Sequence, residues 1–243
     1  MATALLTCTL WGPWAPGAAA ATFTVDPTQV VLTTRGGSAL LSLTNRSTET
    51  LRFELSVFAW TQSEGGEIQL EPTEDIVFFP ALLTLGPNET RRVRIGSVTS
   101  FETLEKSYRI FVEELPPLSA SSGGVRVLTK MGIPIFMRPE EATAAPRLSV
   151  PDAAGSQVRF SLSNEGTVHF VPQAITVRGL AGDRVAFEQH VEGWYVLAGG
   201  RRDFELPVPE AACEQVTSIE VDVQLESDSL HEQLQTPNGV CAS

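Results

Sequence analysis

Histidine and cysteine are scarce in this 243-residue chain, which has three of each. His169, His190 and His231 stand far from one another and from any cysteine, so the short spacing that zinc sites use is missing. The chain also lacks a Gly-x-Ser-x-Gly elbow, a phosphate loop and a dinucleotide fingerprint. The adjacent acids Glu113 and Glu114 would face opposite sides of a strand and could not cooperate as acid and base. These absences argue against an enzyme and predict that no metal or cofactor is bound.

Charge is missing from the first 21 residues, which end in the small residues 18–21, all alanine. This stretch is typical of a secretory signal cleaved near Ala20 or Ala21, although the basic start of such signals is absent and translation could begin upstream. Prolines at 13 and 16 interrupt it, so it is a poor membrane span. Thr7-Cys8 allows a lipoprotein site as a weaker alternative. Because no later stretch has 18 apolar residues in a row, we expect an exported protein that is not inserted in a membrane.

Removal of such a signal would leave two cysteines, Cys213 and Cys241. Two cysteines in an exported chain predict one disulfide in the C-terminal half. Two free thiols remain the alternative, because Cys241 lies close to the end of the chain, where chains often fray.

Basic residues are outnumbered, with 17 lysines and arginines against 29 acids and a formal charge of −12. A surface with this excess of negative charge repels nucleic acid and anionic lipid. We therefore expect neither as a partner.

Helical periodicity is also absent, and short apolar alternations separated by glycine, proline and asparagine follow one another from Phe23 onward. Strands at such spacing are typical of antiparallel sandwiches. The polar, proline-bracketed stretch 139–146 divides the pattern. The sequence therefore predicts an all-β chain with a signal peptide at 1–21, one immunoglobulin-like domain at 22–138, a hinge at 139–146 and a second immunoglobulin-like domain at 147–243.

One long strand is predicted over residues 125–137. In an extended chain its odd positions form an apolar row interrupted only by Thr129, whereas Pro134 cannot donate a backbone hydrogen bond. A proline at such a place indicates an edge strand. Two interpretations follow: an ordinary last strand of a sandwich, or an open edge that lends a strand to a partner. The apolar row consists of Val125, Val127, Met131, Ile133 and Ile135, with Thr129 between them.

Several runs, in the same order along the chain, resemble the periplasmic chaperones of the chaperone–usher pilus pathway, the PapD-like family. In the first half they are Leu-Gly-Pro-Asn-Glu-Thr-Arg-Arg-Val-Arg-Ile at 85–95, Tyr-Arg-Ile-Phe-Val-Glu-Glu-Leu-Pro-Pro at 108–117 and Ile-Pro-Ile-Phe-Met-Arg-Pro at 133–139. In the second half they are Asn-Glu-Gly-Thr-Val-His-Phe at 164–170 and Gly-Trp-x-x-Leu at 193–197.

The resemblance implies a boomerang of two immunoglobulin-like domains that binds pilus subunits in the periplasm and passes them to an outer-membrane usher. The subunits lack their last strand, and the chaperone lends its own in donor-strand complementation. Self-association of the free protein would protect the same edge. The donor residues implied are Val125, Val127, Thr129, Met131 and Ile133.

The match departs from the family at the two basic residues that grip the subunit's terminal carboxylate, whose places hold Gln29 and Pro134. This departure resembles the archaic branch of the family. A carboxylate leaving water still needs a cation, so Arg109 and Lys130 become the candidates for the anchor.

Two further positions match a structural salt bridge of the family, Arg94 and Glu105, which we expect to hold the angle between the domains. The alternative from another class is a secreted immunoglobulin-like structural or adhesive protein, whose last strand would be satisfied within its own sheet.

Overall fold

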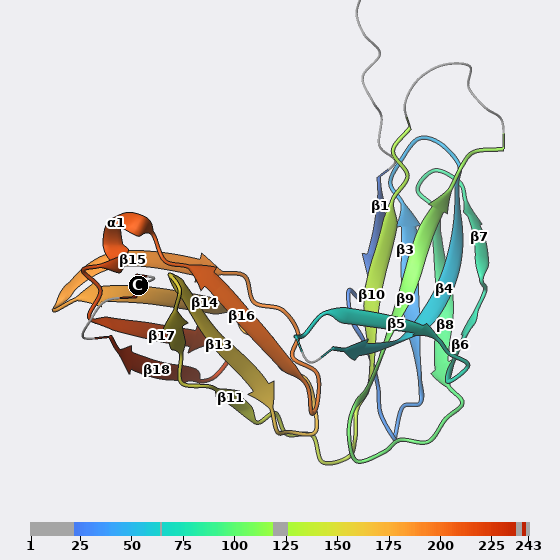
Figure 1. Cartoon of the computed structure of the whole chain (residues 1–243). Helices are drawn as coiled ribbons and strands as arrows, with labels where there is room; N and C mark the ends of the chain where they lie inside the picture. The colour runs from blue at the N-terminus through green and yellow to red at the C-terminus, as the bar shows by residue number, and fades with distance from the viewer. Residues whose placement is uncertain (1–21, 64, 119–125, 237–239, 242–243) are drawn as a thin grey trace, which may run out of the picture.

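The computed structural model of the chain describes residues 22–63, 65–118, 126–236 and 240–241. The predicted signal peptide with its cleavage site, and Val125, lie outside this range. The described part is almost entirely β-structure, with one four-residue helix, α1 (Glu210–Cys213). Two β-sandwiches meet at an angle and leave an open concave side between them (Figure 1). The expectation of an all-β chain with two immunoglobulin-like sandwiches is therefore confirmed.

The N-terminal sandwich consists of two sheets, with strand orders β1-β3-β8-β6 and β2-β10-β9-β4-β5; β7 also pairs with β4. The first sheet contains β1 (Phe23–Asp26), β3 (Ser38–Asn45), β6 (Ile76–Phe79) and β8 (Thr90–Ser97). The second contains β2 (Val30–Leu32), β4 (Leu51–Gln62), β5 (Ile68–Pro72), β7 (Leu82–Leu85), β9 (Lys106–Leu115) and β10 (Lys130–Met137).

Alternation along the strands gives this sandwich its core, because successive side chains of a strand point to opposite faces. In β3, Leu41 and Leu43 are fully buried; in β9, Ile110 and Val112 are as well. Complete burial stabilises the domain by roughly 1.5–3 kcal/mol for each such side chain. The inward row therefore fixes the register of the sheets, since a slip by one residue would expose it.

The C-terminal sandwich repeats the plan with strand orders β11-β13-β12, where β16 also pairs with β13, and β15-β14-β17-β18. One sheet contains β11 (Pro146–Leu148), β12 (Asp152–Ala154), β13 (Gln157–Asn164) and β16 (Arg201–Pro207). The other contains β14 (Ala174–Ala181), β15 (Arg184–Val191), β17 (Ser218–Gln224) and β18 (Ser229–Gln235).

A buried asparagine ends an equivalent strand in each sandwich, Asn45 in β3 and Asn164 in β13. The Asn45 amide donates to the carbonyls of Glu49, Leu85 and Gly86 at 2.7–3.0 Å. Asn164 donates in the same way to two carbonyls of its own domain. Because buried backbone carbonyls need donors, each asparagine fixes the loop that follows its strand.

The strand predicted over residues 125–137 is shorter in the structure, where β10 begins at Lys130. Its antiparallel neighbour β9 ends at Leu115, just before two prolines. The last backbone bond of the ladder joins the Glu114 N–H to the Thr129 carbonyl at 2.9 Å. At this register only Leu115 of β9 remains beyond Glu114, opposite Leu128, so the ladder has almost no length left and the regular strand stops.

Cys213 and Cys241 are joined in a disulfide, the pairing that the sequence favours over two free thiols. Cys213 is buried in α1, and Val240, next to Cys241, is buried in the same core. The Val240 N–H donates to the Cys213 carbonyl at 2.9 Å. The disulfide therefore fixes the C-terminal end of the chain against the second sandwich.

Replacing both cysteines with serine is expected to lower the free energy of unfolding of the C-terminal domain by about 3–4 kcal/mol, because the closed loop spans 28 residues. Denaturant titration followed by circular dichroism measures the loss, and the reduced wild-type protein serves as control. An unfolding midpoint equal to that of the oxidised wild type would contradict the expectation.

Candidate functional site: an open strand edge beside the domain junction

The edge of β10 that faces away from β9 is only partly covered. Its parallel neighbour β2 pairs with Ile135–Met137 alone, while β9 pairs with the whole of β10. Within the described part of the chain, residues 126–134 therefore have no strand on their outer side; we call them the open edge. Val127 and Leu128, in this stretch, are 52% and 40% exposed. β10 lies between β2 and β9 in the sheet, so the sequence-based prediction of an edge strand holds only for Lys130–Pro134, which β2 does not reach.

Ile133 does not belong to the exposed part of the proposed donor row. It is 1% exposed and packs with Ile135 in the core of its own sandwich, and Met131 is half buried against the same core. The odd positions of β10 face inward here because Ile133 and Ile135 lie between the two sheets of the sandwich. Ile133 is therefore corrected to a core residue, whereas Val127 and the half-buried Thr129 lie where the strand leaves the core.

Arg109 lies on β9 directly opposite Pro134, on the outer face of the sheet. Its guanidinium carbon is 4.3 Å from the ring centroid of Trp60 and 5.4 Å from that of Trp194, which belongs to the other domain. No carboxylate of the described chain pairs with it, and its buried Nε has no hydrogen-bond partner. Burial lowers the pKa of Arg109 from its ordinary value. A half-buried cation with aromatic neighbours and no counter-ion is suited to receive an anion.

Lys130, the second anchor candidate, has a different environment. Its ammonium group is 2.8 Å from a carboxylate oxygen of Glu113, and both side chains are about half exposed. It also lies 5.1 Å from the ring centroid of Phe111. Lys130 thus already has a counter-ion, and the structure does not place it next to Arg109 in a shared site.

Gln29, at one of the two positions where the resemblance leads us to expect a basic anchor, lines a cleft of about 570 Å³ between the two domains. Arg138 and His169 line the same cleft. Pro134, at the other anchor position, is buried and presents no charge. Neither of these two positions therefore offers a cation, and the basic side chains that line the cleft are those of Arg138 and His169.

Glu105 is the centre of the polar contacts at the domain junction, and its carboxylate is fully buried. It accepts hydrogen bonds from the backbone N–H of His169 at 3.1 Å and from the His169 ring, whose Nδ1 is in contact with it. Arg138 Nε lies 3.5 Å away. The His169 ring stacks on Phe136 with 3.7 Å between centroids. A buried carboxylate needs such partners, so Glu105 ties the second domain to the first.

The expected pair of Arg94 and Glu105 is wrong. Arg94 lies on β8, in register with Leu40 of β3 and Phe79 of β6, and its side chain is exposed. In the described part of the chain it makes no ion pair with Glu105, which contacts Arg138 and His169 instead. The two residues are separated because β8 belongs to the sheet without β9 and β10, and Glu105 immediately precedes β9.

Gln62 forms a second connection between the domains. Its side-chain amide donates to the Tyr195 carbonyl at 2.7 Å, and its oxygen accepts from the Leu197 N–H at 2.9 Å. Trp60 and Phe136 pack against Leu197 in a small apolar cluster beside this contact. The sequence analysis did not identify Gln62; only the neighbouring Gly-Trp-x-x-Leu motif marked this region.

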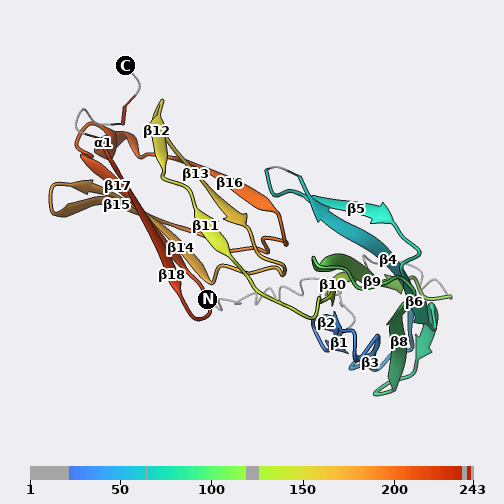
Figure 2. The same cartoon turned by 90° about the horizontal axis from the view of Figure 1, so that it is seen from below.

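The hairpin between β4 and β5 reaches β16 of the second domain (Figure 2). Gly66 near its tip has φ of +83°, a conformation that glycine adopts without strain. A Cβ atom at this position would lie 2.2 Å from Cγ of Arg202, so only glycine fits. The junction is thus formed by the hairpin tip, Gln62 and Glu105.

Within the described residues no group of histidine, cysteine and acidic side chains is arranged to hold a metal ion. The same part of the chain has no helix of the length and apolarity needed to cross a bilayer.

The described chain thus has the architecture of a two-domain immunoglobulin-like protein, in which strand β10 of the first sandwich is only partly paired on its outer side. Residues 22–143 match the family described as pili and flagellar-assembly chaperones with the PapD N-terminal domain. Because this match covers half of the chain, the protein belongs to that family. No curated protein sequence matches the chain.

Solved structures of pilus chaperones share the fold. The chaperone CsuC of the archaic Csu pili of Acinetobacter baumannii, solved with its tip subunit, has a TM-score of 0.62 at 17% identity, over 87% of this chain and 98% of that one. The Pseudomonas aeruginosa chaperone CupB2 has a TM-score of 0.56 at 16% identity, over 87% and 99%. The Salmonella enterica chaperone SafB, solved with the pilin SafA, has a TM-score of 0.54 at 17% identity, over 88% and 96%.

Replacing Glu105 with alanine is expected to cost about 1–3 kcal/mol of unfolding free energy, because the His169 N–H and ring lose their acceptor. We also expect a wider range of angles between the domains in small-angle X-ray scattering. Arg94→Ala is the matched control and should leave both measurements unchanged. Equal effects of the two variants would restore the Arg94 pair and contradict this account of the junction.

Proposed function

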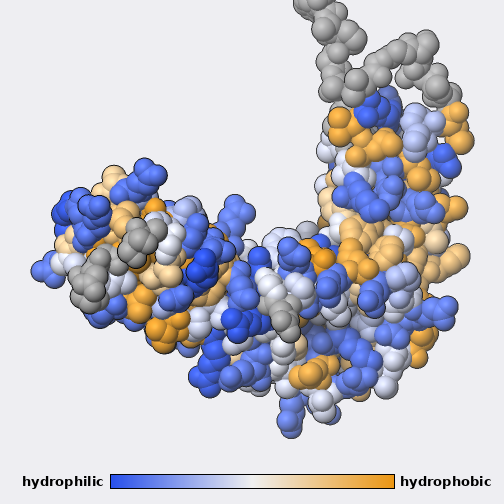
Figure 3. Space-filling view, viewed as in Figure 1, coloured by the Kyte–Doolittle hydropathy of each residue, from blue (hydrophilic) through white to orange (hydrophobic). Residues whose placement is uncertain are grey.

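We propose that this protein is a periplasmic chaperone that binds pilus subunits by lending them the open edge of β10. The observation that supports this most strongly is the half-paired strand: β2 covers Ile135–Met137 only, and Val127 and Leu128 stand exposed beyond the core. An incomplete sandwich needs backbone partners and apolar side chains where its own strand is missing. The open edge offers both. Figure 3 shows apolar patches among the polar surface of this domain.

Delivery of the bound subunit to an outer-membrane usher is the second part of the proposal, and it rests on the family to which the chain belongs. A pull-down of the chaperone–subunit complex with the periplasmic domain of an usher tests this step. If the complex does not bind the usher domain, this part of the proposal is wrong. When no subunit is present, the open edge is expected to pair with a second copy. Sedimentation velocity on the free protein measures that association.

Arg109 is the anchor that the geometry favours for the terminal carboxylate of the subunit. Its guanidinium lacks a counter-ion among the described residues, whereas Lys130 is paired with Glu113. The rings of Trp60 and Trp194 hold it at the side of the junction. A carboxylate that arrives here would gain a charge-assisted hydrogen bond from a cation that has already lost part of its water.

Val127→Asp is expected to weaken subunit binding at least about 100-fold, because it places an unpaired carboxylate in an apolar groove. Co-expression of a candidate pilus subunit with the tagged chaperone, followed by recovery of the one-to-one complex, measures the loss. Val185→Asp, at a similarly exposed valine of the second domain, is the control. Undiminished recovery with Val127→Asp would exclude the open edge as the donor.

Arg109→Ala is expected to lower subunit affinity about tenfold or more, whereas Lys130→Ala should change it little. Arg109→Lys tests whether charge without the planar fork is sufficient. Amidation of the subunit's terminal carboxylate should lower the affinity of the wild-type chaperone, but it should cause no further loss of affinity in Arg109→Ala; titration measures both. If amidation and Arg109→Ala weakened binding additively, the two groups would not be partners.

A further inference from the structure

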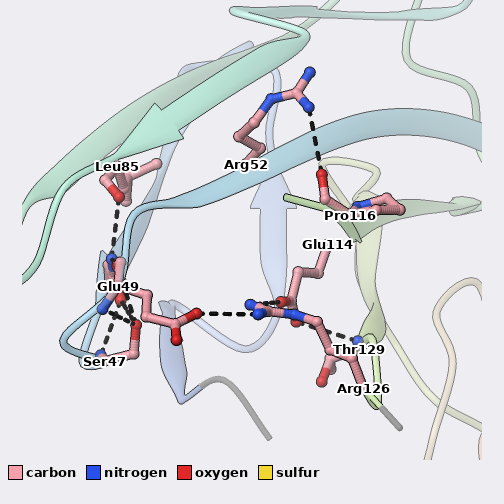
Figure 4. Close-up of polar contacts among 9 residues, drawn as sticks. Ser47, Glu49, Arg52, Leu85, Glu114, Pro116, Arg126 and Thr129 are labelled. Carbon is pink, nitrogen blue, oxygen red and sulfur yellow. Dashed lines mark hydrogen bonds and ion pairs between the residues drawn. The ribbon is translucent and has the colours of Figure 1, made fainter. Parts of the chain in front are cut away.

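Glu114 is a carboxylate with a fully buried side chain at the end of the N-terminal core, next to the open edge. Arg126 Nη2 lies 3.3 Å from its Oε1, and the Thr129 N–H donates to its Oε2 at 3.4 Å. Figure 4 shows the Arg126 side chain lying across to Glu114 from the segment that precedes β10. A buried carboxylate is costly without such a partner, so this contact holds the segment in place.

Glu49 binds the other side of the same guanidinium, with 3.0 Å between its Oε2 and Arg126 Nη1. The loop that carries Glu49 is itself fixed, because the buried Asn45 amide donates to the Glu49 carbonyl at 2.7 Å. Ser47 donates to the Asn45 side chain at 2.8 Å. Arg126 therefore bridges two carboxylates held by the framework, and its hydrogen bond to Glu49 raises the pKa of Arg126.

The bridge is incompatible with a regular strand through residue 126. Lys130 pairs with Glu113, so Thr129 stands opposite Glu114 and both face inward. Continued backwards at this register, an extended strand would place Arg126 on the outer face and roughly 10 Å further along. The Arg126 guanidinium could not then reach the inward-facing carboxylate of Glu114. In the structure β10 begins only at Lys130; of residues 126–129, Val127 alone takes part in an isolated β-bridge and the other three belong to no strand.

We propose that Arg126, which bridges Glu49 and Glu114, is a latch. It keeps residues 126–129, the first part of the donor segment, out of strand conformation until a subunit is captured. The proposal rests on the proposed function of the open edge. Capture requires residues 126–129 to extend, so the Arg126 contacts must open. The two ion pairs of Arg126 therefore slow capture, and they keep the segment that contains Val127 from forming a permanent edge strand.

Hydrogen–deuterium exchange of the full-length chain tests the latch without any subunit. Amides 127–130 are expected to exchange about threefold faster in Glu49→Gln, which removes an exposed partner. They should exchange about tenfold faster in the double variant Glu114→Gln/Arg126→Met, which leaves no buried charge unpaired. Arg91→Met, which breaks the exposed pair of Arg91 on β8 with Glu89 just before that strand, is the matched control and should exchange like the wild type. Unchanged exchange in both latch variants would overturn the proposal.

The capture rate supplies the functional measurement. The probe is the subunit recovered with the wild-type chain, unfolded in denaturant and diluted into the chaperone. We expect about three- to tenfold faster complex formation in the latch variants and the wild-type rate in Arg91→Met. The latch would be refuted if the variants exchanged faster but captured the subunit at an unchanged or lower rate. The Arg126 ion pairs would then position the donor segment or only stabilise the fold. If the wild-type chain captures no subunit, the proposed function fails, while the exchange result still decides whether the bridge holds the segment.

Discussion

The half-paired strand β10 is the constraint on which the rest of the structure depends. One side of it is bonded along its whole length to β9, and the other side only over its last three residues to β2. The paired part belongs to the chaperone's own core, as the burial of Ile133 and Ile135 shows. If the proposed function holds, the unpaired part has to stay accessible to a subunit without pairing with other chains, which open edges tend to recruit. The ion pairs around Arg126 and the aromatic neighbours of Arg109 both lie beside this part of the strand.

Charged side chains serve two different purposes beside this strand. Glu105 and Glu114 are buried carboxylates with partners inside the chain, and they fix backbone segments that would otherwise be loosely held. Arg109 has the opposite character, since it is half buried against two tryptophan rings and has no counter-ion in the described chain. A buried charge that has its partners holds the surrounding backbone in one conformation, whereas one without a counter-ion can bind an oppositely charged ligand. This difference separates framework residues from the candidate anchor.

The sequence predicted the fold because alternation, turn residues and Pro134 are local signals, and each one marks a strand or its end. It did not show which part of the apolar row in β10 belongs to the core, since that depends on where the neighbouring strands end. The pair of Arg94 and Glu105 was wrong for a similar reason. The true partner, His169, is 64 residues away in the chain and reaches Glu105 only after the two domains have docked.

The side chain of Gln62 has a consequence for how the second domain can move. Its amide bonds to a carbonyl and an N–H of the second domain just as a neighbouring backbone would. Movement of that domain is therefore restrained through β4, which pairs with β9, as well as through the short connection at 139–145. Arg109, the candidate anchor on β9, is thus connected to the second domain twice, through β4 with Gln62 and directly through the ring of Trp194.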